Sequence, residues 1–205
     1  MALHVFVVMP FGEKEGIDFN RVYSEYIAPA LENEDFEVFR ADQERRAGEI
    51  RTDMFQELLL ADLVVADLSI DNPNVWYELG VRHALRARGI LLIQARRENQ
   101  PFDVYTDRKL HYHLKDGAPD DAFLESDKQA LADMARETVE SWHGRKISPV
   151  YHLLQNLKEP DWESLRIGDI GEYWERYSNW QARIELARQA GQIGAILVLA
   201  DEAPF

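Results

Sequence analysis

The stretch from Ala61 to Leu85 constrains the fold more than any other part of the chain. The apolar, β-branched run 63–68 predicts a buried strand, and a short polar turn follows it. Asn72 is a good N-cap and Pro73 a preferred first helical residue, so we expect a helix from Asn72 to about Arg88. A buried strand that runs directly into a helix is half of a βαβ unit, from which parallel sheets are built.

The same alternation continues on both sides of this stretch. Apolar runs predict strands at 3–9, 36–41, 89–94 and 109–114, and residues 18–33 and 50–60 carry apolar side chains at helical spacing. Pro29 is expected to bend the first of these helices. Short connections favour right-handed crossovers with helices on both faces of the sheet. We therefore predict an α/β fold with a flavodoxin-like, five-stranded parallel sheet and a switch point near the first and third strands.

The pattern changes near Asp120. Helical patterns follow at 122–142 and 151–157, an aromatic-rich segment covers 168–190, and no strand alternation appears after Leu114. We expect residues 1–118 to form the α/β domain and residues 119–205 a helical extension, packed on that domain or leading out of it. The chain shows no internal repeat and no low-complexity linker.

Composition restricts the partners and the chemistry. The net charge of −14 argues against a nucleic-acid backbone or an anionic membrane as the main partner. No stretch approaches the ~20 apolar residues that span a bilayer, and the N-terminus lacks a secretory signal pattern. The absence of cysteine excludes disulfides, thiol catalysis and Cys-based metal sites. We expect a cytoplasmic protein.

Glu78 is the sharpest candidate for chemistry. It lies more than one turn inside the predicted helix, too deep for capping, and shares a helical face with Asn74. Ligands of open parallel sheets bind outside the C-terminal ends of the strands, where Glu78 would stand. The alternative is a surface glutamate on an exposed helix face. Asp67 ends the preceding strand, so we expect its carboxylate to emerge at the same crevice; its alternative role is an Asx-turn that orders the next loop.

Weaker candidates lie at the same edge of the predicted sheet. Asp42 follows the second strand, where nucleotide-binding α/β proteins often place an acid that binds ribose. Asn72 and Asn74 have amide groups suited to orienting sugar hydroxyls, although capping alone explains Asn72. The end of the first strand would supply backbone groups and an aromatic ring against which a planar base could lie. Proline and glycine at a strand end are also ordinary in turns. The residues at this strand end are Met9, Pro10, Phe11 and Gly12.

Other site classes find no support in the sequence. His111 and His113 alternate along a predicted strand, but no carboxylate is spaced to complete a metal site with them, so we expect no metal. The chain has no GxGxxG, P-loop or GxSxG motif. Nothing in the sequence requires a bound cofactor.

Ordered motifs within residues 3–115 resemble a known family. They are Val7-Val-Met-Pro-Phe-Gly12, Asp18-Phe-Asn-Arg-Val-Tyr23, Ile27-Ala-Pro-Ala-Leu31, Arg40-Ala-Asp42, Ala61-Asp-Leu-Val-Val-Ala-Asp67 and Asn74-Val-Trp-Tyr-Glu-Leu-Gly80. The set resembles the nucleoside 2-deoxyribosyltransferase-like group, which is related in fold to TIR domains. It is most similar to the N-terminal domain of bacterial tetratricopeptide-repeat proteins related to the apoptosis signal-regulating kinases. The resemblance implies C-terminal helical repeats and, since relatives complete their sites across subunits, a homodimer.

The resemblance also implies a role for Glu78. In the transferases a glutamate in a Gly-Thr-x-x-Glu-x-Gly setting attacks the anomeric carbon, and Glu78 matches it by position. Asp67 would be its partner, as an acid or a sugar-orienting group. The sequence departs from the transferases at two places. Asn74-Val75 replaces Gly-Thr, and Asn72 stands where the transferases often carry an aspartate. These differences affect the expected acid–base chemistry and the choice of substrate.

Two functions from different classes follow. The first is an N-glycosidase that cleaves the sugar–base bond of a nucleoside, nucleotide or NAD-like compound, as a signalling or defence effector. Its glutamate, Glu78, acts as nucleophile or as stabiliser of an oxocarbenium ion, and transfer is as compatible with the sequence as hydrolysis. The alternative is a non-catalytic nucleotide sensor, or a protein-interaction scaffold, that signals through its C-terminal helices.

Overall fold

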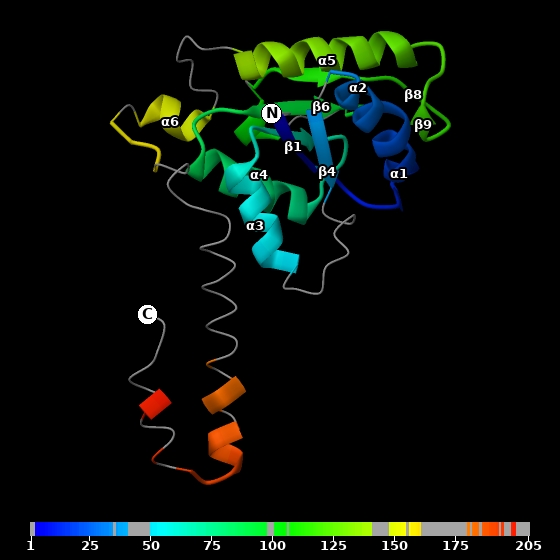
Figure 1. Cartoon of the computed structure of the whole chain (residues 1–205). Helices are drawn as coiled ribbons and strands as arrows, with labels where there is room; N and C mark the ends of the chain where they lie inside the picture. The colour runs from blue at the N-terminus through cyan, green and yellow to red at the C-terminus, as the bar shows by residue number, and fades with distance from the viewer. Residues whose placement is uncertain are drawn as a thin grey trace. The chain divides into compact units, whose positions relative to one another are not determined.

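The computed structural model describes residues 3–34, 36–40, 50–97, 101–105, 107–140, 148–154, 156–160, 180, 182–184, 186–192, 194 and 198–199, with the backbone alone at 50–53 and 103. The chain forms two compact units, Met1–Pro160 and Asp161–Phe205. The first unit contains the sheet (Figure 1). Each unit is described by itself.

The first unit is built on a five-stranded, all-parallel sheet with the order β4-β1-β5-β6-β7. Counted along the chain, this order is 2-1-3-4-5, so the predicted flavodoxin-like topology is confirmed. The chain leaves β1 on one side for β4 and returns on the other side to β5, which places the switch point between β1 and β5. The strands are β1 (Leu3–Val8), β4 (Phe36–Arg40), β5 (Leu63–Asp67), β6 (Ile90–Gln94) and β7 (Lys109–His111).

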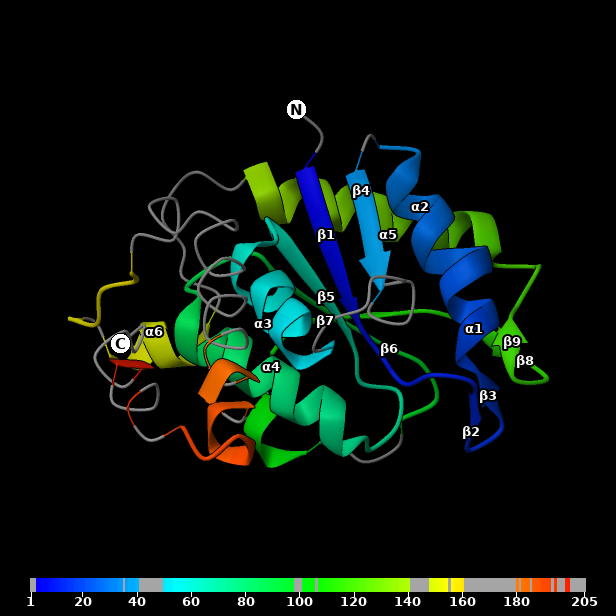
Figure 2. The same ribbon diagram turned by 60° about the horizontal axis from the view of Figure 1, so that its bottom comes forward.

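Helices cover both faces of the sheet because its strands are apolar on both sides (Figures 1 and 2). Val5 and Val7 of β1 point into one apolar cluster, and Phe6 and Val8 point into the other. The first cluster is covered by α1 (Phe19–Arg21), η1 (Val22–Ile27), α2 (Ala28–Glu32) and α5 (Leu124–Glu140). The second is covered by α3 (Ile50–Leu60) and α4 (Pro73–Leu85).

The helix expected at 18–33 contains a π-helical segment, η1, directly before Pro29. Ala28 N–H donates to the Tyr23 carbonyl, five residues back, which is the π-helical pattern. Pro29 has no N–H, and its ring would clash with the carbonyl four residues back in a regular α-helix. The wider turn accommodates the proline, so the distortion predicted at Pro29 takes the form of a π-helix.

Two hairpins of very short strands were not predicted. They are β2 (Glu13–Lys14) with β3 (Ile17–Asp18), and β8 (Leu114–Lys115) with β9 (Ala118–Pro119). The backbone N–H of Asp18 donates to the Gly117 carbonyl at 2.8 Å, and this hydrogen bond joins the two hairpins. Because β8 pairs with β9, the run expected as one strand at 109–114 is divided between β7 and β8. Strands of two residues are too short to show an alternating pattern.

The first unit extends beyond the expected boundary at residue 118. Leu131 and Ala135 of α5 are fully buried in the first apolar cluster, so this helix belongs to the α/β core. Among the described residues, the first unit also contains η3 (Phe102–Val104) and α6 (Pro149–Leu153). Residues 161–179, which include most of the aromatic-rich segment, lie outside the described residues. Within the described part of the chain, no helix is long and apolar enough to cross a membrane.

Candidate functional site

Helix α4 places Glu78 near the C-terminal edge of the sheet. Asn72 caps the helix directly after β5, accepting hydrogen bonds from the backbone N–H groups of Asn74 (3.0 Å) and Val75 (3.3 Å). The helix packs against β5 and β1, the two strands at the switch point, and against α3. Its buried row is Val75, Leu79 and Arg82.

Glu78 lies on the side of α4 that faces α3. The ring of Tyr77 contacts the ring of Phe55 from α3, with centroids 6.2 Å apart. At about 100° per residue, Glu78 falls between Tyr77 and the buried row. The side chain is half-buried.

The environment of the Glu78 carboxyl favours its neutral form. Burial raises the pKa of Glu78 from its ordinary value of 4.5 to about 7. Across the described residues, nothing donates a hydrogen bond to this carboxyl or forms an ion pair with it, so no contact there offsets the loss of hydration. A carboxyl that titrates near neutrality beside a sheet switch point has the properties expected of a catalytic acid, base or nucleophile.

Asp67 points to the opposite face of the sheet from Glu78. It shares the parity of Val65 along β5, and its side chain is 0% exposed. Oδ1 accepts from the Ser69 N–H at 2.8 Å, and Oδ2 accepts from the Tyr112 hydroxyl at 2.8 Å. Burial raises the pKa of Asp67, and the hydrogen bonds from Ser69 and Tyr112 act against that rise. The expectation that this carboxylate emerges at the crevice is wrong, and the structure does not bring Asp67 and Glu78 together.

Asp67 instead orders the loop that leads to α4. The Ser69 hydroxyl lies 3.1 Å from the Tyr112 hydroxyl and accepts from the Ala95 N–H at 2.8 Å. Asp67 thus links the ends of β5 and β6 and the residue that follows β7. This is the Asx-turn alternative to a catalytic role.

Replacing Tyr112 with Phe tests this network. The substitution leaves Oδ2 of Asp67 buried without its donor, so we expect the free energy of unfolding to fall by about 1–3 kcal/mol. Urea denaturation of Tyr112→Phe measures the change. Tyr105 is 69% exposed, so Tyr105→Phe is the control and should unfold like the wild type. Equal stability of the two variants would show that the network does not stabilise the fold.

The residues after β1 form a loop held from within. Met9 and Pro10 are buried, whereas the Phe11 ring is 43% exposed. Gly12 adopts φ +69°, a left-handed conformation that favours glycine. Its N–H donates to Asn20 Oδ1 at 3.4 Å and its carbonyl accepts from the Phe19 N–H at 3.0 Å. Both backbone groups of Gly12 are therefore engaged, and Phe11 is the part of the loop that offers an open surface.

Arg40, at the end of β4, was not singled out by the sequence analysis. Its side chain is 6% exposed, and its guanidinium lies 4.3 Å from the Tyr23 ring centroid and 5.4 Å from that of Phe11. Nη2 donates to Asn20 Oδ1 at 3.2 Å, and Nη1 donates to the Phe19 carbonyl at 3.4 Å. A polar residue at the end of an apolar strand is an ordinary pattern, so the sequence held no specific signal for this position.

Arg97, beyond the end of β6, is a second arginine that the sequence analysis did not identify. Nη1 donates to the Leu68 carbonyl at 2.8 Å and Nη2 contacts Asp71 Oδ1 at 2.5 Å. Its guanidinium also lies 5.6 Å from the Trp76 ring centroid. Arg97 therefore fixes the loop between β5 and α4, which places the N-terminal end of the helix that carries Glu78.

The remaining predicted residues have three different outcomes. Asn72 is 8% exposed and serves as the helix cap. Asn74 is exposed in the first turn of α4, on the face it shares with Glu78. Asp42 lies outside the described residues, so its role stays a prediction.

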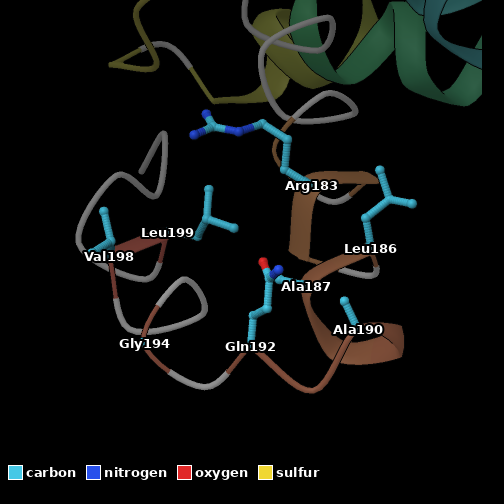
Figure 3. Close-up of a pocket in the computed structure, with 8 residues that line it drawn as sticks. All are labelled: Arg183, Leu186, Ala187, Ala190, Gln192, Gly194, Val198 and Leu199. Atoms are coloured by element: carbon cyan, nitrogen blue, oxygen red, sulfur yellow. The ribbon is translucent and has the colours of Figure 1, made fainter.

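A cavity of about 650 Å³ lies in the second unit (Figure 3). Arg183 and Gln192 are the polar side chains among the residues that line it. The other lining residues are Leu186, Ala187, Ala190, Gly194, Val198 and Leu199. The described residues that line the cavity include no acid, imidazole or nucleophile. The described residues also contain no cluster of three or more His, Asp or Glu side chains that would hold a metal ion.

Comparison with protein-family models and with curated proteins found no relative of this chain: no family model matches it, and no curated protein is significantly similar to it. The fold class is therefore established by the sheet topology, as an α/β protein of flavodoxin-like strand order.

Proposed function

We propose that this protein is an N-glycosidase that cleaves the bond between sugar and base in a nucleoside, a nucleotide or an NAD-like compound. The observation that carries the proposal is the half-buried Glu78 carboxyl, which titrates near pH 7 at the C-terminal edge of a parallel sheet. The resemblance of the motif Asn74-Val-Trp-Tyr-Glu-Leu-Gly80 to the deoxyribosyltransferase-like group supports the same chemistry.

The environment of Glu78 suits a reaction that develops positive charge. Cleavage of an N-glycosidic bond passes through an oxocarbenium-like transition state. A poorly hydrated carboxylate gains more from such a cation than from a neutral ground state, and this difference accelerates the reaction. In the proposed sequence Glu78 attacks the anomeric carbon while the C–N bond breaks and its electron pair leaves with the base. Water then hydrolyses the glycosyl ester, which restores the carboxylate and releases one proton to solvent, and a base that leaves as an anion takes up one proton from solvent.

In this proposal Asp67 does not touch the substrate, because its side chain is fully buried and its two oxygens accept from Ser69 and Tyr112. Asp67 acts on the site indirectly, by ordering the loop between β5 and α4. The exposed Phe11 ring and Asn74 are the residues proposed to meet the base and the sugar.

The test is base release, measured by chromatography, from a panel of nucleosides, nucleotides and NAD. We expect release from at least one member of the panel and an equal amount of free or transferred sugar. The product also separates hydrolysis from transfer, because a second base in the mixture is glycosylated only by transfer. Folded protein that releases no base from the whole panel would contradict the proposal.

The pH dependence of base release should report Glu78. The nucleophile must be ionised, so kcat/KM should rise with pH through about 7, the pKa of Glu78, and level off above it. The measurement is kcat/KM between pH 5 and 9 with a substrate that does not titrate in this range. A profile that is flat or falling through pH 7 would show that ionised Glu78 is not the reacting form.

A non-catalytic nucleotide sensor is the second candidate, and two hydrogen bonds favour it. The segment that precedes the second unit is fastened to the C-terminal end of α4. The Ser148 hydroxyl donates to the His83 carbonyl at 2.5 Å, and the Glu159 carboxylate accepts from the Ala87 N–H at 2.9 Å. A ligand that shifts α4 would therefore act on the chain that leads to the second unit. Ligand binding without base release would favour this function.

A further inference from the structure

We infer that Arg40 determines the base specificity of the site through the Phe11 ring. Its charge lets neutral, electron-rich bases such as purines stack on Phe11 and disfavours cationic rings such as nicotinamidium. The inference deepens the proposed function and rests on it, since it names the base that the site holds. It is argued from the contacts of Arg40.

Strand parity and hydrogen bonds fix the Arg40 guanidinium. Val38, two residues earlier in β4, packs against the apolar cluster under η1, and Arg40 points to the same face. There it donates to the Phe19 carbonyl and to Asn20 Oδ1. The Met9 sulfur lies 4.0 Å from Nη1. A group held by several contacts in a buried position keeps its place when a ligand arrives.

The guanidinium lies between two aromatic rings, that of Tyr23 (4.3 Å) and that of Phe11 (5.4 Å). Tyr23 is 6% exposed and therefore forms the buried side of the stack. Phe11 is the outer ring, and at 43% exposed it has surface left for a ligand. The loop that carries Phe11 follows β1, one of the two strands at the switch point.

A positive charge next to one face of an aromatic ring changes what the other face attracts. The negative π-face of phenylalanine ordinarily favours cations. The Arg40 cation already draws on the π-electrons of Phe11, and it repels a second cation on the far side of the ring. A neutral purine keeps its stacking energy there, whereas a pyridinium ring loses attraction.

The experiment compares adenosine with nicotinamide riboside, which share the ribose and differ in the charge of the base. Equilibrium affinities are measured by calorimetry in the Glu78→Gln protein, so that neither ligand is consumed. We expect adenosine to bind about fivefold more tightly or better, the scale of one cation–π contact at an exposed site. Arg40→Met should bring the ratio of the two affinities toward one, and Arg40→Lys, which keeps the charge, should preserve the preference.

The Phe11→Leu variant completes the design. It should lower the preference by removing the stacking surface of the purine, and Arg40→Met added to it should lower the ratio further, but by less than in the wild type, because the charge of Arg40 also repels a cationic ring directly. Circular dichroism and thermal melting confirm that each variant is folded. An unchanged ratio in Arg40→Met, an equal loss of both affinities, or no binding of either ligand to folded protein would each overturn the inference.

Failure of the inference and failure of the proposed function give different results. If wild-type protein prefers adenosine but releases no base from any substrate, the glycosidase proposal falls and the specificity of Arg40 stands. If it releases base in a Glu78-dependent way but binds nicotinamide riboside as tightly as adenosine, the glycosidase stands and the inference falls.

Discussion

Glu78→Gln is expected to reduce base release by about 10³-fold or more, because the amide neither attacks the anomeric carbon nor neutralises an oxocarbenium ion. Glu78→Asp keeps the charge but withdraws it by about 1 Å, which should cost about 10²-fold. Glu137 is exposed on α5, so Glu137→Gln is the control and should release base at the wild-type rate. The measurement is kcat/KM at pH 8, with each variant shown to be folded. Turnover by Glu78→Gln within tenfold of the wild type would rule out this residue as the nucleophile.

The same substitution should make the protein more stable. The folded pKa of Glu78, about 7, lies above its ordinary value of 4.5, so the ionised carboxylate is disfavoured in the folded state. Stability is therefore lost as pH rises from 4.5 through 7, and glutamine does not suffer this loss. We expect Glu78→Gln to be more stable than the wild type by about 1–2 kcal/mol at pH 8, after allowance for solvent screening, and equally stable near pH 4. A gain in stability with a loss of activity is typical of a functional site.

The strand order was predictable because apolar runs, short connections and the handedness of crossovers leave few arrangements of the sheet. The face to which each side chain points was not predictable. The strand 63–68 is apolar at every position except Asp67, so its sequence does not show which residues face α4 and which face η1. The pairing of Asp67 with Glu78 failed on this point: the two residues are near each other in sequence and lie on opposite faces of the sheet.

Other features of the site depend on contacts between distant residues. The stack of Phe11, Arg40 and Tyr23 joins three separate segments, and no single segment carries a pattern that indicates it. The pKa of Glu78 likewise depends on the burial of its side chain, which a sequence position alone does not give. The cap at Asn72, by contrast, is a local interaction, and its sequence signal was sufficient.

Arg82 should be the residue whose loss most destabilises the helix that carries Glu78. Its side chain is fully buried, and its guanidinium donates to the carbonyls of Leu58 (2.7 Å), Arg88 (3.2 Å) and Gly89 (3.0 Å). It thereby joins the end of α3 to the turn between α4 and β6. Burial lowers the pKa of Arg82 to about 9, which still leaves it charged at neutral pH. One side chain thus satisfies backbone groups that the surrounding core shields from water.

Arg82→Met keeps much of the side-chain volume and removes the guanidinium donor from the Leu58 and Arg88 carbonyls, whereas the Gly89 carbonyl keeps the Val64 N–H at 2.8 Å. We expect the free energy of unfolding to fall by about 2–4 kcal/mol, because the Leu58 and Arg88 carbonyls lose this donor together. The control is Arg88→Met, at an exposed position in the turn that follows α4, which should change stability by less than about 0.5 kcal/mol. Urea denaturation at pH 7 measures both variants. If Arg82→Met unfolds like Arg88→Met, the buried guanidinium does not hold α3, α4 and β6 together.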